Sequence, residues 1–417
     1  MIYGLIAEKV GHSFSAEIHK KLFGYDYELK AIKSDELEEF LSRREFKAIN
    51  VTIPYKEAVI KHLDYVNPDA LEIGAVNTIV NRDGRLYGYN TDSIGLQLLM
   101  KRAGIVLANK KVLVLGSGGT SKTAYYVARL SDCESVFRVS RSNKDGCITY
   151  DEAVRLHNDA DVVINTTPCG MYPENSVSAI EIDDFKRLSA VVDVVYNPLR
   201  SKLVTDARKK GIKAVGGLYM LVAQAAKAAE YFVEKSVPDE RIDEIYYEIL
   251  RSKQNVVLVG MPGCGKTSTG KLVAEALSYK FVDTDEAIYE KIGKYPHEII
   301  NESGESAFRD IEAMVINEIS KLQGCVISTG GGAVLRQKNI DNLRGNGRIY
   351  FLDRAIEQLA ITSDRPLSST LESLKKRFEE RYDIYKSCCD KHIIAVDGKA
   401  LNANAVLEDF LNENSCN

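Results

Sequence analysis

The chain has 417 residues, of which 45% are hydrophobic and 27% are charged, and its formal net charge is -4 with an isoelectric point near 6.0. At roughly 100 to 200 residues per domain, this length predicts two to four domains, each large enough to bury a core. The slightly acidic balance argues against a nucleic-acid or membrane partner, no apolar stretch approaches the roughly 18 residues of a membrane span, and we expect a cytoplasmic protein.

Cysteines and histidines show no metal-binding pattern. The eight cysteines contain no Cys-x-x-Cys pair, and the six histidines form no His-Glu-x-x-His motif. We therefore expect reduced thiols, mostly buried, and the sequence disfavours a structural metal. Composition does not set the oligomeric state, and a homo-oligomer is compatible with it.

Short apolar runs rich in β-branched residues alternate with amphipathic stretches along the whole chain. Such runs, with little polar alternation, are typical of parallel strands that helices cover on both faces. The pattern predicts an α/β fold, built at least twice. The expected strands are Ile2 to Ile6, Ala48 to Ile53, Lys111 to Leu115, Ser135 to Val139, Asp161 to Asn165, Ala190 to Val195, Asn255 to Val259, Cys325 to Ser328 and Arg348 to Leu352.

The main boundary is expected near residue 251. The sequence becomes helical and then charged between Gln224 and Leu250, and Arg251 to Gln254 lead into a fresh strand. This predicts one part over residues 1–250 and another over 251–417. Because the connection is short and lacks a Gly/Ser or Pro tract, we expect the two parts to be held close.

The first part carries a glycine-rich turn between a strand and a helix, which is the setting of a dinucleotide site. The turn consists of Gly116, Ser117, Gly118, Gly119 and Thr120, and the helix is expected over Lys122 to Leu130.

The next strand ends in Ser140 and Arg141, and Lys144 follows three residues later. A carboxylate at this strand end would favour NAD. Hydroxyl and positive groups there favour the 2′-phosphate of NADP. The alternative is a tight turn followed by a solvated basic corner.

Lys56 and Asp92 each follow a strand-like run in the first part. In a cleft beside a nicotinamide, such a pair could handle the proton that accompanies hydride transfer to a ketone. Taken singly, each is more often a surface charge, and spacing alone does not decide between these interpretations.

Long motifs then point to one family. The first part resembles shikimate dehydrogenase along essentially its whole length, in motifs that include His12-Ser13-Phe14-Ser15, Asn50 to Lys56, Gly74 to Thr78, Asn90-Thr91-Asp92, Asn165 to Met171, Tyr196 to Leu199 and Met220 to Ala226. The resemblance implies a substrate lobe (1–103 plus 217–250) and a Rossmann-type NADP lobe (104–216).

The same resemblance assigns roles to individual residues. Lys56 becomes the acid/base residue with Asp92 beside it, Gly217 contacts the nicotinamide through its backbone, and Val194 is a further cofactor-binding residue. The implied substrate contacts are Ser13 and Ser15 for the carboxylate, Thr52, Asn77, Asp92 and Gln224 for the hydroxyls, and Tyr196. Ala16, Lys20 and Tyr219 depart from the family pattern, which leaves the preference between shikimate and quinate open.

The second part opens with a phosphate-binding loop, Gly260 to Thr267, which fits G-x-x-x-x-G-K-[ST] in full between a strand and a helix expected over Ser268 to Ser278. In such a loop, successive N–H groups cradle phosphates, the lysine bridges the β- and γ-phosphates and the Thr267 hydroxyl can bind Mg²⁺. The residues assigned to ATP are Gly263, Cys264, Gly265, Lys266, Thr267 and Ser268.

Charged residues after the next strands indicate what accepts the phosphate. Asp283 and Asp285 follow one strand and a triple glycine follows another, so all should meet at the carboxyl edge of the sheet. One carboxylate can support Mg²⁺ while the other binds or deprotonates a hydroxyl. Arg309, expected where Phe308 to Glu312 open a helix, suits a carboxylate or phosphoryl group, although alone it would be a surface charge.

These residues resemble shikimate kinase over about residues 253 to 400. The matching motifs are the loop, Asp283-Thr284-Asp285, Gly304 to Arg309, the triple glycine, Arg365-Pro366-Leu367 and Arg381 to Tyr385. The resemblance implies a P-loop domain with a parallel sheet, in which Asp285, Arg309, Gly331 and Arg381 bind shikimate. It also implies that Asp283 supports Mg²⁺ through water, and that Arg365 lies on a lid, which looks short, and faces the phosphates.

The sequence thus predicts a bifunctional enzyme of the shikimate pathway that uses NADP(H), ATP and Mg²⁺ on small-molecule substrates. It would reduce 3-dehydroshikimate to shikimate and then phosphorylate shikimate. One alternative is a non-catalytic sensor of pathway intermediates, which the retained Lys56, Asp92, Lys266 and Asp283 disfavour. The other is a first part that acts on quinate with NAD.

Overall fold

The structure, a computed structural model, describes residues 2–11, 13–359 and 371–412. It divides into two compact units, Met1–Ile249 and Leu250–Asn417, so the division falls one residue before the expected position. The N-terminal unit contains two sheets and the C-terminal unit one. No helix among the described residues combines the length and apolar character that crossing a bilayer requires.

The first sheet is mixed, with strand order β2-β1-β3-β5-β6-β4. β1 is parallel to β2 and β3, whereas β5 runs antiparallel to both β3 and β6. The expected strands did not include the β5–β6 hairpin, although its Asp83-Gly84 turn, with positive φ at both residues, is a typical hairpin signal. The strands are β1 (Tyr3–Ala7), β2 (Glu28–Ala31), β3 (Ala48–Val51), β4 (Tyr65–Val66), β5 (Thr78–Arg82) and β6 (Arg85–Tyr89).

The second sheet is entirely parallel, with strand order β12-β11-β10-β7-β8-β9. Its central strands are mainly apolar and almost entirely buried, as the sequence predicts for a sheet covered on both faces. The strands are β7 (Lys111–Leu115), β8 (Ser135–Ser140), β9 (Ile148–Thr149), β10 (Val162–Asn165), β11 (Ala190–Asp193) and β12 (Lys213–Val215).

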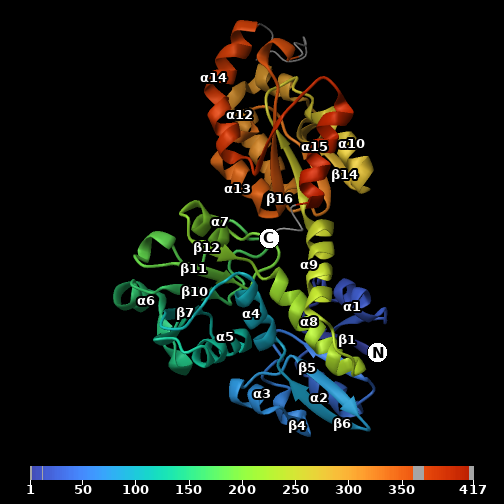
Figure 1. Cartoon of the computed structure of the whole chain (residues 1–417), viewed down its shortest axis with the longest axis vertical. Coiled ribbons are helices and arrows are strands. Elements are labelled where there is room, and N and C mark those ends of the chain that lie inside the picture. The colour runs from blue at the N-terminus through green and yellow to red at the C-terminus, as the bar shows by residue number, and fades with distance from the viewer. Residues whose placement is uncertain (1, 12, 360–370, 413–417) are drawn as a thin grey trace. The chain divides into compact units, whose positions relative to one another are not determined.

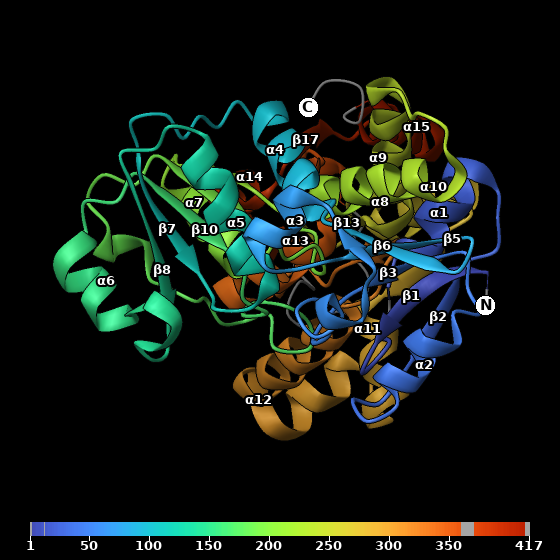
Figure 2. The ribbon, with the colours of Figure 1, turned by 90° about the horizontal axis from the view of Figure 1, so that it is seen from below.

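Helices connect and cover these two sheets. α8 packs against α1 and α4, and α5 packs against α3 and α4, so that helices fill the region where the two sheets meet (Figure 2). The α-helices are α1 (Ser15–Phe23), α2 (Leu37–Arg43), α3 (Pro68–Ile73), α4 (Asp92–Arg102), α5 (Gly119–Leu130), α6 (Tyr150–His157), α7 (Lys202–Lys209), α8 (Leu218–Val233) and α9 (Asp239–Lys253).

The C-terminal unit has one parallel sheet with strand order β14-β15-β13-β16-β17. In Figure 1, α10 and α15 lie on one side of this sheet and α12, α13 and α14 on the other. The strands are β13 (Asn255–Val259), β14 (Lys280–Asp283), β15 (Cys325–Ser328), β16 (Gly347–Asp353) and β17 (Lys391–Ile394). The helices are α10 (Lys266–Leu277), α11 (Thr284–Ile292), α12 (Pro296–Ile319), α13 (Gln337–Asn346), α14 (Leu371–Cys388) and α15 (Lys399–Asn412).

One helix differs from its expected start. Phe308 to Glu312 lie inside α12 and do not open it. Helical dihedral angles are interrupted at Gly304, where φ is +85°, so the break precedes the charged motif by four residues. Glycine allows this change of direction because it lacks a Cβ.

Candidate functional sites

Lys56 and Asp92 meet in the N-terminal unit. Lys56 follows β3 and Asp92 is the first residue of α4, yet the lysine Nζ lies 2.5 Å from an Asp92 carboxylate oxygen. Both side chains are largely buried, with 12% and 9% of their surface exposed. Lys56 Nζ also lies 3.3 Å from the Thr120 hydroxyl, at the start of α5 in the Rossmann lobe. The pair therefore stands where the two lobes face each other.

Asn77 holds the carboxylate from the other side. Its Nδ2 donates to Asp92 Oδ1 at 2.9 Å and to Thr91 Oγ1 at 3.0 Å, and it lies 3.4 Å from Gln224 Oε1. Its own Oδ1 accepts from the Thr91 backbone N–H at 2.8 Å. Three predicted substrate residues, Asn77, Asp92 and Gln224, thus form one connected network.

The serines predicted to bind the substrate carboxylate are paired. Ser13 Oγ donates to Ser15 Oγ at 3.0 Å, and the Ser15 N–H donates to Ser13 Oγ at 3.2 Å. Phe14 between them contacts the Tyr196 ring edge-on, with centroids 5.3 Å apart. Burial raises the pKa of the Tyr196 phenol, so this hydroxyl stays protonated near neutrality. Thr52 is partly exposed after β3, four residues before Lys56.

The glycine-rich turn fits a dinucleotide phosphate. Gly116 has φ of +123°, and a Cβ there would lie 2.5 Å from Thr166 Oγ1. A Cβ at Gly119 would lie 3.2 Å from the Lys56 side chain, whereas the space beside Gly118 is open. The turn therefore brings the N-terminus of α5, with the N–H groups of its first turn and its positive dipole end, toward the lobe interface.

Both ends of an extended cofactor have candidate contacts. A Cβ at Gly217 would lie 2.1 Å from the Val194 carbonyl oxygen, so only glycine allows these two predicted cofactor residues to lie this close. At the far end, Ser140 is buried and accepts a hydrogen bond from the Ser142 N–H, while Arg141 and Lys144 are exposed. Two exposed cations beside a hydroxyl suit a 2′-phosphate.

Tyr219, which departs from the family pattern, packs against α9. Its ring packs edge-on against Tyr246 of α9, with centroids 5.2 Å apart. The Arg102 guanidinium lies 4.9 Å from the Tyr219 ring and 5.2 Å from Tyr246, and it forms an ion pair with Asp243 at 2.6 Å. We call these four residues the Arg102 cluster.

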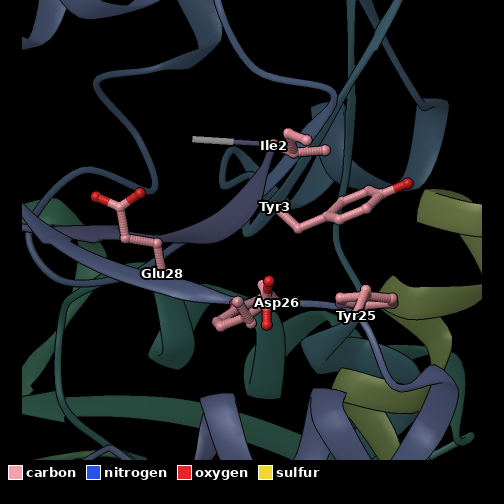
Figure 3. Close-up of a pocket in the computed structure, with 6 residues that line it drawn as sticks. Ile2, Tyr3, Tyr25, Asp26 and Glu28 are labelled. Carbon is pink, nitrogen blue, oxygen red and sulfur yellow. The ribbon is translucent and has the colours of Figure 1, made fainter.

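A cavity of about 380 Å³ lies elsewhere in the first sheet. Figure 3 shows its lining residues, Ile2, Tyr3, Tyr25, Asp26, Tyr27 and Glu28. It sits at the start of β1 and β2, whereas Lys56 follows the carboxyl end of the parallel strand β3. The charged groups among these six residues are both carboxylates, so the cavity does not suit an anionic substrate or a dinucleotide.

The phosphate-binding loop in the C-terminal unit is preformed. Gly263 and Gly265 have φ of +82° and +101°, and α10 begins at Lys266. The Lys266 ammonium is buried and donates to the carbonyl oxygens of Gly260 and Met261, both at 2.9 Å. Cys264 is buried beside it and Ser268 follows in the first turn. The positive φ angles and the helix N-terminus fit a bound phosphate chain.

Two oxygen-bearing side chains beside the phosphate-binding loop could bind a divalent cation. The Thr267 hydroxyl donates to Asp283 Oδ2 at 3.0 Å, and Asp283 also caps α11 by accepting from the Asp285 N–H at 3.0 Å. Hydroxyl and carboxylate oxygens are the ligands that Mg²⁺ prefers, with phosphates and water completing its shell. Among the described residues, no group of three or more His, Cys, Asp or Glu side chains is placed to hold a metal ion.

Arg309 forms ion pairs with two glutamates. Its NH1 lies 2.8 Å from Glu312 Oε2 and its NH2 lies 2.9 Å from Glu305 Oε1. Burial opposes the charge, but these carboxylates raise the pKa of the Arg309 guanidinium. Burial raises the pKa of Glu312, which is 1% exposed.

The triple glycine brings the acceptor residues together. Ideal Cβ positions at Gly330 and Gly332 lie 3.1 Å from Asp285 Oδ1 and 2.2 Å from the Arg309 guanidinium. Arg381 NH1 donates to the Gly331 carbonyl at 3.1 Å. Four predicted shikimate residues thus converge, and Glu312 joins them. The i, i+3 spacing of Glu312 from Arg309 could have revealed it. Arg365 lies outside the described residues.

Comparison with known proteins places the N-terminal unit. A shikimate dehydrogenase of Clostridium perfringens strain 13, NADP(+)-dependent by name, is 38% identical over 266 residues, covering 60% of this chain and 98% of that relative. The family model of the shikimate dehydrogenase substrate binding domain matches residues 5–79. The chain belongs to the shikimate dehydrogenase family.

Solved structures agree with this family. A chorismate mutase/shikimate 5-dehydrogenase fusion from Clostridium acetobutylicum is 36% identical, with a TM-score of 0.56, covering 60% of this chain and 96% of that one. The Thermus thermophilus shikimate 5-dehydrogenase in complex with NADP(H) and shikimate is 31% identical, with a TM-score of 0.54, covering 60% and 99%.

The family model of shikimate kinase matches residues 262–413, so the C-terminal unit is a shikimate kinase domain. The expected fold class is confirmed in both units. The chain therefore combines an oxidoreductase that uses NADP(H) with a phosphotransferase domain that uses ATP and Mg²⁺. The residue roles given above stay predictions, which the geometry makes testable.

Proposed function

We propose that this chain catalyses two consecutive reactions: the NADPH-dependent reduction of 3-dehydroshikimate to shikimate, and the MgATP-dependent phosphorylation of shikimate at its 3-hydroxyl. The observation that carries the proposal is that one chain holds both the Lys56–Asp92 pair and a complete phosphate-binding loop beside Asp285, Arg309 and Arg381. The product of the first reaction is the acceptor of the second.

In the N-terminal unit, bound NADPH would supply the hydride. The Lys56 ammonium would donate a proton to the carbonyl oxygen that becomes the new hydroxyl. Asp92 holds this ammonium in position, and the Asn77 network orients Asp92. Ser13 and Ser15 would hold the substrate carboxylate from the start of α1.

In the C-terminal unit, bound MgATP would supply the phosphoryl group. Arg309 and Arg381 would bind the shikimate carboxylate, and Asp285 would accept the proton of the attacking hydroxyl. Lys266 would neutralise charge on the phosphates, while Thr267 and Asp283 would hold Mg²⁺. Glu312 and Glu305 keep the Arg309 guanidinium in place for this contact.

The test supplies 3-dehydroshikimate, NADPH and MgATP to the full chain and follows NADPH absorbance and phosphorylated product together. We expect NADPH loss and the appearance of shikimate 3-phosphate. Adding shikimate and MgATP alone isolates the kinase, and shikimate with NADP⁺ measures the reverse oxidation. Folded protein that forms no phosphorylated product would refute the kinase half of the proposal.

Substrate preference is a separate question, because Ala16, Lys20 and Tyr219 depart from the family pattern. Tyr219 packs within the Arg102 cluster, and the exposed Arg141 and Lys144 support NADP, so we assign shikimate with NADP to this site. Comparing kcat/KM for shikimate and quinate with NADP and NAD decides the matter. A higher value for quinate with NAD would overturn this assignment.

We also propose that the protein works in the cytoplasm, where NADPH and ATP are both supplied. The seven cysteines among the described residues are free thiols, which suits a reducing compartment. Cell fractionation followed by the coupled assay tests the location, and sedimentation of the purified chain tests whether it forms a homo-oligomer.

A further inference from the structure

A buried carboxylate that has no role in the reactions above lies at the carboxyl end of β11. Asp193 is fully buried, and its two oxygens accept three hydrogen bonds. Oδ1 accepts from Asn165 Nδ2 at 2.9 Å and from the Val195 N–H at 3.0 Å, and Oδ2 accepts from the Ser201 hydroxyl. We call these four residues the Asp193 network.

The network fastens the loops that follow two neighbouring strands. Asn165 ends β10, and its Oδ1 accepts from the Thr167 N–H at 3.1 Å and from the Thr167 hydroxyl at 2.7 Å. The Val194 N–H donates to the Asn165 carbonyl at 2.9 Å. Ser201 caps α7, since its Oγ accepts from the Val204 N–H. Asp193 thus closes the 194–200 loop at both ends and ties it to β10.

This loop carries the residues expected at the nicotinamide and the substrate. The Val194 carbonyl lies against Gly217, and the Gly217 N–H donates to the Val195 carbonyl at 2.9 Å. Tyr196 reaches across to Phe14, which stands between the two paired serines. A shift of the loop would therefore move cofactor contacts and substrate contacts together.

The hydrogen-bond pattern of Asp193 does not require a negative charge. Burial raises the pKa of this carboxyl to about 6, in spite of its three hydrogen-bond donors. When protonated, Oδ2 can donate to Ser201 Oγ, while Oδ1 keeps its two N–H donors. An amide of the same shape would present the same oxygen and a donor in place of Oδ2.

We propose that Asp193 is a positioning residue of the dehydrogenase unit: it sets the 194–200 loop at the nicotinamide end of the NADP(H) site, through hydrogen bonds and independently of charge. The proposal rests on the proposed dehydrogenase function. It assigns no chemical step to Asp193, which acts only through Val194, Tyr196 and Gly217.

The experiment compares Asp193→Asn with Asp193→Ala in the full chain. NADPH affinity is measured by the rise in its fluorescence on binding, and KM and kcat are measured separately. We expect Asp193→Ala to weaken NADPH binding and raise its KM about tenfold, with kcat at saturation changed less than about threefold, because the three hydrogen bonds to Asp193 are lost. Asp193→Asn should stay within about twofold of wild type.

A second pair of variants tests the same proposal in case Asp193→Ala folds poorly. Ser201→Ala should weaken NADPH binding about threefold, since one hydrogen bond to Asp193 is lost, and Ser201→Thr should restore it. The proposal is overturned if Asp193→Asn is as damaging as Asp193→Ala, or if folded Asp193→Ala or Ser201→Ala binds NADPH like wild type. Wild-type protein that binds NADPH but reduces no dehydroshikimate would instead refute the proposed function.

Discussion

The two units hold their key lysines in different ways. In the dehydrogenase unit, the partner of Lys56 is the carboxylate of Asp92, which comes from another element and is itself held by Asn77. In the kinase domain, Lys266 donates to two carbonyl oxygens of its own loop, Gly260 and Met261. One lysine is set by distant side chains and the other by local backbone.

This difference indicates which substitutions each site can tolerate. A side-chain network depends on every member, because each buried polar group left without a partner costs about 1 to 3 kcal/mol. A loop that supplies backbone carbonyls and N–H groups depends mainly on its dihedral angles, and hence on Gly263 and Gly265. Four predictions test the comparison.

Lys56→Ala should lower dehydrogenase kcat by about 10²- to 10⁴-fold, the usual contribution of general acid catalysis. It should leave the kinase unchanged. Lys122→Ala is the matched control, because Lys122 lies nearby but pairs with Glu57 at the surface. Loss of both activities in folded protein would contradict the assignment of separate sites.

Lys266→Ala should lower kinase kcat by about 10²- to 10³-fold, because one charged donor to the transferring phosphoryl group is lost. Dehydrogenase activity should persist, as followed by NADPH absorbance. Lys271→Ala, on the exposed face of α10, is the control. A fully active Lys266→Ala would show that the loop backbone suffices.

The third prediction concerns pH and the Asp193 network. The pKa of Asp193 is raised from 3.8 to about 6 in the folded unit, so the native state binds this proton more tightly than the unfolded chain. Its stabilising contribution is therefore complete below about pH 4 and is lost as the pH rises through about 6, by up to about 3 kcal/mol.

Denaturant unfolding at pH 4.5 and 7, in buffers chosen at roughly these values, measures this contribution as the difference between wild type and Asp193→Asn. Subtraction is needed because Asp64, Glu152 and Asp159 have lowered pKa values, and their contributions rise with pH. An equal pH dependence in both proteins would show that Asp193 is not the group that titrates.

The smallest effect is expected in the one part of the kinase site that resembles the dehydrogenase network. Glu312→Gln should raise the KM for shikimate about tenfold with little change in kcat, because Arg309 loses its buried charged partner. Glu305→Gln, at an exposed partner of the same guanidinium, should change KM less. Equal effects would mean that burial of the partner does not matter.

The same contrast explains what could be predicted from the sequence. The phosphate-binding loop is contiguous, so its strand, glycines and helix were all predictable from local pattern. β7, β13 and β15 have the bounds that the sequence predicts, because a short, mainly apolar run in the sequence corresponds directly to a buried strand. The convergence of Asp283, Asp285 and the triple glycine also followed from the rule that strand ends gather at one edge, whereas only the family resemblance assigned Arg309 to the site.

Other features depend on pairs of residues far apart in the chain. Spacing alone could not distinguish Lys56 and Asp92 from ordinary surface charges. Only the family resemblance identified them as site residues. Asp193 was not among the predicted site residues, because its partner Asn165 is brought to it by the pairing of β10 with β11. Tyr219 was recognised as a departure, but its place in the Arg102 cluster depends on how α9 docks.

The Arg102 cluster also determines where a dehydrogenase fragment made for separate expression can end. α9 places Asp243 and Tyr246 on Arg102, and its buried residues Ile242, Ile245 and Ile249 belong to the N-terminal unit. A dehydrogenase fragment that stops before α9 would leave that guanidinium and an apolar face uncovered. The shortest fragment fit for separate expression therefore extends through Ile249, and α9 belongs to the dehydrogenase for nearly its whole length.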